Sequence, residues 1–432
     1  MNRVYLLFFI FIYSACMDKF IIPSSLENQG TDDFGAGDTT FVQISPIWGS
    51  EYGFTKPTEI SIAQDGRLYI VDKEANSIFV LDQDGTQPNG FEALKNLKDN
   101  QNLLISPVDV DIDKKMNVYF IDGSERIFVW NQYWNDIGIK KVSTGGTFTH
   151  IETGTDTSIN YGSSLWFSLL NSNDWIIKEL TSTEDQIIID SLTQPHIFYD
   201  GNDEMNQFLD TYYNSSESTF SGLTTTFDSG NYIFVTDNYG GADNQHRIVQ
   251  INFQRSLLIE LMNDEYVWCF RGQFGSTIKG SGTGAGTLNH PVSLDMDYQG
   301  NLYYSQEGDF FPVHMIKPNL SGDFATYTSG FQPSSDDIMD SDLFIKAVDV
   351  AVDNSRNVYV VDEGESNIHV FNSNGNYFKS LGFIGDSVSV LNTPTAVAVD
   401  ERGVLYVCNS GDSSIYRFKL SNSLDEDLKS ED

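Results

Sequence analysis

Short strand patterns repeat along the chain in a fixed order, most regularly in residues 346–382. In that stretch three strand patterns, VDVAV, NVYVV and NIHVF, are each followed by a polar turn, and a fourth, YFKSLG, completes the group. Runs of this length and composition, bounded by turn residues, are typical of β-strands. The stretch therefore predicts a four-stranded antiparallel unit. One such unit cannot bury both faces of its sheet, so copies of it must stack.

The same unit can be aligned six times on the small residue that opens its first strand. The openers are Pro57, Pro107, Gly222, Pro291, Ala347 and Pro394. The interval between Pro107 and Gly222 is about twice the usual length, which predicts a divergent unit with strands at 147–153, 164–170, 175–180 and 186–190. Residues 196–218 are then a polar excursion. Seven units are expected, and the alternative is six units with a long insertion.

The repeat resembles the NHL-repeat family of β-propellers, and the resemblance covers residues 41–420. It rests on the run from the opener through a VAVD-like strand, a Gly or Asn turn and a VYVVD-like strand, as in 291–306, 348–362 and 397–409. The resemblance implies an all-β propeller built of four-stranded antiparallel blades. Propellers serve as binding modules, scaffolds and several unrelated enzymes, so the fold does not imply one function.

The two ends of the repeat region predict how the ring closes. The last unit stops after its third strand, SSIYRFKL, and continues as the acidic segment 421–432, which we expect to be disordered. The stretch TFVQISPIW at 40–48 precedes the first opener, where an outer strand belongs. We expect it to complete the last blade, because closure removes an exposed strand edge.

The N-terminal segment predicts export and anchoring. Residues 1–15 combine one arginine with a short apolar run, which suits a signal peptide better than a membrane span. The motif YSAC resembles a bacterial lipoprotein signal and implies lipid attachment to Cys16. An ordinary signal peptide or a short uncleaved anchor are the alternatives. Residues 16–39 read as a flexible tether. The expected location is the bacterial cell envelope, as an outer-membrane or cell-surface lipoprotein on the periplasmic or extracellular face.

The charge of the chain limits its partners. The formal net charge is −36, from 25 basic and 61 acidic residues. Such a surface repels nucleic acid and anionic lipid headgroups, so membrane contact is expected through the lipid anchor only. We expect a monomeric propeller whose partner is a protein or an extracellular ligand.

Several carboxylates occupy early positions of the predicted innermost strands, where the last blade has alanines. Innermost strands line the axis of a propeller, so these side chains are expected to converge in its channel. Clustered carboxylates would bind a hard cation such as Ca²⁺ or share protons, and the alternative is that they face water. Ca²⁺ is the one cofactor that these carboxylates suggest. The residues are Glu59, Asp109, Asp111, Asp295 and Asp349.

Two longer loops, 237–247 and 306–314, join second and third strands of neighbouring blades. We call the side of the ring that carries these loops the loop-rich face. Exposed aromatic residues on loops suit recognition. Three neighbouring histidines also suggest Zn²⁺, although no HxH or HExxH spacing supports it. The candidate ligand-binding residues are Tyr239, His246, His290, Phe310, Phe311 and His314.

The leading hypothesis is an exported, lipid-anchored propeller that acts as a binding or scaffolding module through its loop-rich face. The alternative is a metal-dependent propeller enzyme, a lactonase-like or lyase-like hydrolase that uses the channel carboxylates or the histidines. No GxSxG or comparable nucleophile setting supports catalysis. The regular unit at 346–382 is expected to be scaffold rather than a site.

Overall fold

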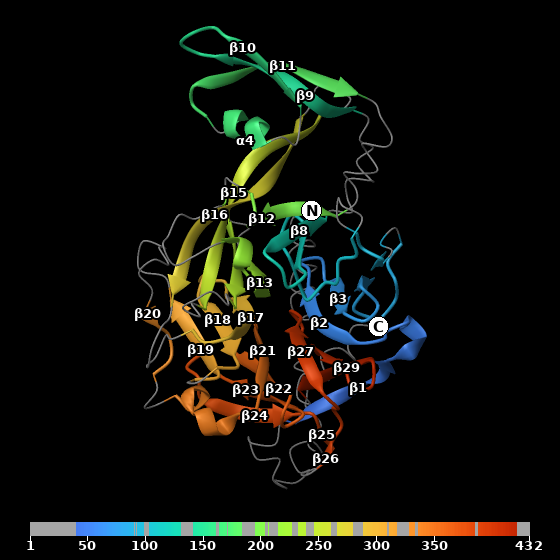
Figure 1. The fold of residues 1–432 in the computed structure, drawn as a ribbon. Helices are drawn as coiled ribbons and strands as arrows, with labels where there is room; N and C mark the ends of the chain where they lie inside the picture. The colour runs from blue at the N-terminus through green and yellow to red at the C-terminus, as the bar shows by residue number, and fades with distance from the viewer. Residues whose placement is uncertain are drawn as a thin grey trace, which may run out of the picture. The chain divides into compact units, whose positions relative to one another are not determined.

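The computed structural model describes residues 40–420 with internal gaps, and residues 41–419 form one compact unit (Figure 1). The expected signal peptide, Cys16, the expected tether and the acidic segment 421–432 lie outside the described residues. No helix in the described part of the chain is both long and apolar enough to cross a membrane. The residues outside the description are 1–39, 90, 92, 99–102, 131–140, 161–163, 171, 184–194, 204–205, 207–214, 227–231, 239–245, 261–265, 280–287, 309–310, 318–327, 333–335, 385–387 and 421–432.

Six four-stranded antiparallel groups follow one another, and five of them run from an innermost strand outward in chain order. Blade 1 contains β2 (Pro57–Ile62), β3 (Leu68–Asp72), β4 (Ser77–Leu81) and β5 (Leu94–Lys95). Blade 2 contains β6 (Asp109–Ile112), β7 (Val118–Ile121), β8 (Arg126–Trp130) and β12 (His196–Asp200). Blade 3 contains β13 (Phe220–Thr225), β14 (Tyr232–Asp237), β15 (Arg247–Glu260) and β16 (Tyr266–Lys279).

Blades 4 and 5 follow the same order, whereas the outer strand of blade 6 comes from the start of the ring region. Blade 4 contains β17 (Pro291–Met296), β18 (Leu302–Gln306), β19 (Val313–Lys317) and β20 (Thr328–Ser329). Blade 5 contains β21 (Ala347–Val352), β22 (Val358–Asp362), β23 (Asn367–Phe371) and β24 (Tyr377–Leu381). Blade 6 contains β27 (Pro394–Val399), β28 (Leu405–Asn409), β29 (Ser414–Leu420) and β1 (Phe41–Trp48). The chain also forms a two-stranded ribbon, β25 (Phe383–Ile384) and β26 (Val388–Ser389), and 3₁₀ turns at Ser50–Tyr52, Ser215–Glu217, Asp337–Met339 and Ser341–Leu343.

The ring closes as the sequence predicts. Each innermost strand contacts the next, in the order β2, β6, β13, β17, β21 and β27, and β27 contacts β2 again. The N-terminal strand β1 pairs with β29 and is the outer strand of blade 6. The all-β propeller and its closure by an N-terminal strand are therefore confirmed.

The number of blades differs from the expected seven, because the candidate strands of the extra unit do not form a blade. The first three fall in β9 (Lys141–His150), the helix α4 (Ser164–Leu170) and β11 (Trp175–Thr183), with β10 (Asp156–Asn160) between β9 and α4. The fourth, 186–190, lies outside the described residues. Strand β9 pairs with β10 and β11, and its first residues pair with the end of β15. We call residues 141–183 the arm. The ring has six blades in the described chain, so the alternative of an insertion is the correct one.

The arm interrupts blade 2 between its third and fourth strands. The fourth strand is β12, which pairs with β8 through His196 and Val129. It lies in the stretch interpreted as a polar excursion. The local pattern cannot reveal this, because the place of a strand is decided by its partner across 65 residues of intervening chain. The opener of blade 3 is Phe220 and not the expected Gly222. Phe220 pairs with Asp237 at the end of the second strand, as Pro57 pairs with Asp72 in blade 1.

Two repeated polar contacts fix the blades, and both explain residues that recur in the sequence. After the innermost strand of blade 5, Asp353 Oδ2 accepts from the Asn357 amide (2.8 Å) and the Tyr359 hydroxyl (3.0 Å). At the end of the second strand, Asp362 accepts from the backbone N–H groups of Ile345 (2.7 Å) and Lys346 (3.0 Å). Equivalent caps at the second-strand end are made by Asp72, Asp237, Gln306 and Asn409. These short polar residues are scaffold, as their recurrence predicts.

Candidate functional sites

The predicted channel carboxylates do line one cavity. It has a volume of about 180 Å³ and contains all five of them. Glu59, Asp109 and Asp349 occupy the equivalent early position of their strands, opposite Val71, Ile121 and Val361, and Asp111 and Asp295 lie two residues further along. The carboxylates thus form two layers along the channel.

Most of these carboxylates bridge neighbouring blades. Asp109 accepts from its own neighbour Val110 N–H and from Leu223 N–H of blade 3, each at 2.6 Å. Asp295 accepts in the same way from Met296 and from Val352 of blade 5, each at 2.7 Å. The channel side of an innermost strand has no further strand to pair with, so its N–H groups need other acceptors. The carboxylates supply them and join the blades.

Asp111 and Asp349 make the same kind of bridge. Asp111 accepts from Thr225 N–H (2.6 Å) and from the Ser61 hydroxyl (2.7 Å), which lie in blades 3 and 1. Asp349 accepts from Val397 N–H (2.7 Å) of blade 6. A structural role is therefore shown for four of the five side chains, and Glu59 accepts from Ile60 N–H within its own strand.

The channel is electrostatically unusual because its carboxylates have no basic neighbour among the residues that line it. Burial, together with the charge of Asp111, raises the pKa of Asp295 to about 8. Burial and the charges of Asp349 and Asp109 raise the pKa of Glu59 well above its ordinary value. Burial also raises the pKa of Asp109 and of Asp349. With a pKa of about 8, the Asp295 carboxyl retains its proton at neutral pH.

The channel carboxylates do not gather around one point. Within the described chain, the single group of three acidic, His or Cys side chains whose ligand atoms all lie within 4.8 Å of one another is Asp362, Glu365 and His369. The predicted Ca²⁺ ligands are therefore spread along the channel.

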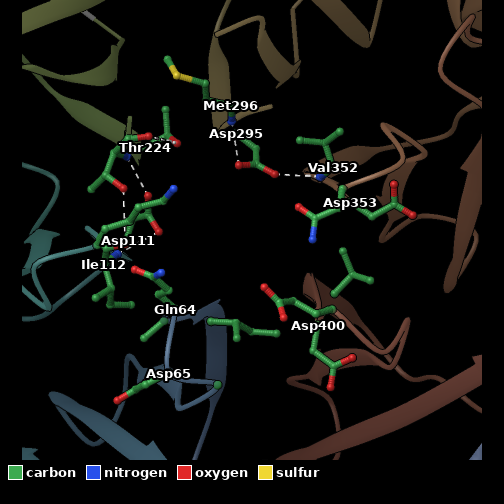
Figure 2. Close-up of a pocket in the computed structure, with 18 of the residues that line it drawn as sticks. Gln64, Asp65, Asp111, Ile112, Thr224, Asp295, Met296, Val352, Asp353 and Asp400 are labelled. Carbon is green, nitrogen blue, oxygen red and sulfur yellow. Dashed lines mark hydrogen bonds between the residues drawn. The ribbon is translucent and has the colours of Figure 1, made fainter. Parts of the chain in front are cut away.

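The channel widens into a pocket of about 750 Å³ to which all six blades contribute (Figure 2). Figure 2 shows Asp111, Asp295 and Asp400 around an open centre. The pocket lies at the turns that follow the innermost strands, such as 63–66 and 353–355, so it opens on the side opposite the loop-rich face. Asp400 is already paired with Arg402 at 2.9 Å, and Asp353 is held by its own turn.

The candidate residues of the loop-rich face are mostly covered. His246 is buried with its ring centroid 4.0 Å from that of the exposed His290, and burial with the charge of His290 lowers the pKa of His246 to about 4. His314 is buried in β19 beside Tyr304, and burial lowers its pKa to about 4. Phe311 is half-buried.

Among the described candidates the structure brings together His246 with His290, and Phe311 with His314, whose ring centroids lie 6.5 Å apart. The three histidines do not form a ligand group among the described side chains. Tyr239 and Phe310 lie outside the described residues, as does the lipidation candidate Cys16. The predicted recognition surface remains a prediction for those positions.

The arm occupies the region in which the sequence predicted an additional blade. One face of its three-stranded sheet packs against α4, in a small core of Phe148, Trp166 and Leu169. The other face carries hydroxyl pairs such as Thr147 with Ser158 at 2.9 Å. Among the described strands β11 pairs with β9 alone, so it is an edge strand.

Large apolar side chains are also exposed on the arm. Ile151, Leu165 and Ile176 are exposed by 56%, 51% and 55% of their surface. Ile176 lies in the edge strand β11, and Leu165 lies in α4. An edge strand with exposed apolar residues is a site at which another chain can pair.

Comparisons with known proteins found distant structural similarities only. No protein-family model matches this chain, and no curated protein matches it. Among solved structures, a streptogramin B lyase has 9% identity and a TM-score of 0.43, over 88% of this chain and 98% of its own. A gluconolactonase from Xanthomonas campestris has 11% identity and a TM-score of 0.46, over 89% and 90%. Virginiamycin B lyase from Staphylococcus aureus has 13% identity and a TM-score of 0.43, over 89% and 100%. At these identities no activity is transferred to this chain, which is described by its fold as a six-bladed β-propeller.

Proposed function

We propose that this protein is an exported, lipid-anchored propeller of NHL type that acts as a binding module, and that the arm contacts a protein partner. The observation that carries the proposal is the arm itself, which has its own small core, an edge strand and exposed Ile151, Leu165 and Ile176. These features add nothing to the closure of the ring. They suit strand pairing reinforced by apolar contacts with another polypeptide.

The other concave and loop-borne features support this role less well. The carboxylates of the channel and pocket accept hydrogen bonds from the protein, which leaves few polar groups for a small ligand. His246 and His314 are buried, and Phe311 is half-buried. We therefore propose the arm, rather than the loop-rich face, as the binding element.

Excision of the arm is expected to abolish capture of the partner while the ring still folds. His196 of β12 pairs with Val129 of β8, so the two strands can be joined directly as a hairpin. Replacement of residues 131–194 by Asn-Gly supplies the turn that such a hairpin favours. The measurement is quantitative recovery of cross-linked envelope proteins with the wild-type and the shortened protein, with circular dichroism to confirm the fold.

A matched pair of point variants separates recognition from general surface polarity. Ile176→Glu on β11 is expected to reduce recovery at least tenfold, because a charge would be buried on pairing. Ile345→Glu alters an isoleucine of the ring that is 71% exposed and should leave recovery unchanged. Equal recovery of the same proteins by the wild-type and the arm-deleted protein would show that the arm is not the binding element.

Replacement of Cys16 by serine is expected to move the protein from the membrane fraction to the soluble envelope fraction and to remove incorporation of labelled fatty acid. The reason is that serine cannot form the thioether link to the lipid. Ser24→Ala, in the expected tether, is the control and should stay in the membrane fraction. A wild-type protein that is exported without label would support an ordinary signal peptide. Membrane association without label would support an uncleaved anchor, and either result contradicts lipidation.

A further inference from the structure

We propose that Asp362, Glu365 and His369 of blade 5 form a binding site for a divalent transition-metal ion, with Zn²⁺ as the best-suited ion. Their ligand atoms lie within 4.8 Å of one another. His369 Nε2 is 3.6 Å from Glu365 Oε2 and 3.9 Å from Asp362 Oδ2. These separations are too long for hydrogen bonds. They are close to the distance of about 3.3 Å between ligands that are each about 2.0 Å from a tetrahedral zinc ion.

The imidazole of His369 is the observation that points to a ligand. The residue is only 4% exposed, and its Nε2 is buried with no hydrogen-bond partner. Its other nitrogen, Nδ1, lies 2.8 Å from the Ser380 hydroxyl. When Nδ1–H donates to that hydroxyl, the Nε2 lone pair faces two carboxylates. Such an arrangement is unfavourable without a cation, and a hydrogen-bonded Nδ1 is the usual support of a metal-bound histidine.

Blade 1 shows which part of this group is needed for folding. At the same spacing it has Asp72, Ala75 and Phe79. Asp72 accepts from Thr55, Lys56 and Ala75 N–H, as Asp362 accepts from Ile345, Lys346 and Glu365 N–H. The aspartate is therefore part of the turn in both blades. Glu365 and His369 are additions that the turn does not require.

In blade 6 the side chains at the positions of Glu365 and His369 form a hydrogen bond with each other. It has Asp412 and Tyr416 there, and the tyrosine hydroxyl donates to Asp412 Oδ2 at 3.0 Å. In blade 5 the equivalent side chains are close and do not bond. Glu365 Oε2 accepts instead from the Asn367 side-chain amide at 2.9 Å, and a cation between the carboxylate and the imidazole would bind both.

The donor set selects the class of metal. One imidazole and two carboxylates are ligands for Zn²⁺ and its neighbours in the first transition series, whereas Ca²⁺ prefers an all-oxygen shell. The side chain of Glu365 is 38% exposed, which gives a path from solvent and room for a water ligand. Asp362 is fully buried and keeps its backbone bonds, so it anchors the site.

Zinc binding by the full chain, purified without a histidine tag and treated with a chelator, tests the site. Titration with ZnCl₂ in a calorimeter is expected to show one ion per chain, and Co²⁺ should give the visible absorption of a tetrahedral site. His369→Phe and Glu365→Ala are each expected to weaken Zn²⁺ binding at least 100-fold. Together they recreate the residues of blade 1, so the double variant should fold, as circular dichroism can verify.

The matched control is His314→Phe. His314 occupies the same register in blade 4, opposite Tyr304 as His369 is opposite Val360, but the second strand there ends in Gln306. This variant should bind Zn²⁺ like the wild type, and CaCl₂ should give no comparable heat. The proposal is overturned if the wild type does not bind Zn²⁺, or if folded His369→Phe binds it as tightly as the wild type does.

Discussion

Replacement of Trp48 by alanine is expected to lower the free energy of unfolding by about 3–5 kcal/mol, the usual loss for a large buried aromatic residue. Trp48 is fully buried at the end of β1. Its ring lies 5.8 Å from that of Tyr406, and the guanidinium of Arg417 lies 4.5 Å from the ring centroid. It therefore joins the first strand of the ring to the last blade.

The matched control is Ile47→Ala, one residue earlier in the same strand. Ile47 is 38% exposed, so its truncation should cost less than about 1 kcal/mol. Deletion of residues 40–48 is expected to have a larger effect than either variant, because blade 6 would lose its outer strand and the ring would present an open edge. The measurement is chemical denaturation followed by tryptophan-independent far-ultraviolet circular dichroism. An unchanged midpoint for Trp48→Ala would contradict closure by β1.

Raising the pH from 6.5 to 8 is expected to destabilise the protein, because the channel carboxyls bind more protons when folded than when unfolded. The pKa is raised for Asp295, to about 8, and also for Glu59, Asp109 and Asp349. A raised folded-state pKa contributes stability that is complete below the ordinary pKa of about 4 and is lost as the pH rises through the folded value. Each such proton contributes a slope of at most about 1.4 kcal/mol per pH unit.

The window begins at pH 6.5 because the histidines act in the opposite direction below it. The pKa of His246 and of His314 is lowered to about 4 by burial, and that of His369 is lowered in the same direction. Their unfolded forms bind the extra proton between about pH 4 and 6.5, so they make stability rise with pH there. Above pH 6.5 less than half of each unfolded histidine is protonated, so this opposing effect fades and the carboxyls decide the slope.

Asp295→Asn isolates one carboxyl of the channel. Its free energy of unfolding should fall less steeply between pH 6.5 and 8 than that of the wild type. The difference in slope should be at most that of one bound proton, about 1.4 kcal/mol per pH unit. Glu401→Gln removes an exposed carboxylate at the pocket and should leave the slope unchanged. Denaturant titrations at a series of pH values provide the comparison. The interpretation fails if wild-type stability rises across this window, or if Asp295→Asn leaves the slope as it was.

The fold could be predicted largely from local patterns, because most blades consist of strands and turns that follow one another in the chain. Ring closure could also be predicted, since the last unit lacks a fourth strand and the chain offers one before Pro57. The blade count could not, because β12 resembles a loop in isolation and becomes a strand only through its pairing with β8. The strands of the arm have ordinary strand composition, and nothing local distinguishes them from strands of a blade.

The candidate sites could be predicted where they depend only on which face of a strand a side chain occupies. Alternation along the innermost strands correctly placed Asp109 and Asp295 in the channel, but their partners, Leu223 and Val352, belong to other blades and leave no mark in the sequence. The proposed site in blade 5 does not stand out in the sequence, for the opposite reason. The unit at 346–382 is so regular that it was interpreted as scaffold, although comparison of Glu365 and His369 with Ala75 and Phe79 would have revealed it.

Because β1 pairs with β29, the ring cannot close until the last strand has been synthesised. The first strand of the ring to be synthesised waits for the last, and at about 5–20 residues per second the interval is roughly 20–75 s. During that time β1 has no partner, and blade 6 cannot be completed from a nascent chain. Folding of the ring must therefore follow completion of the polypeptide. We expect residues 41–48 to be the part of the new chain most in need of a chaperone.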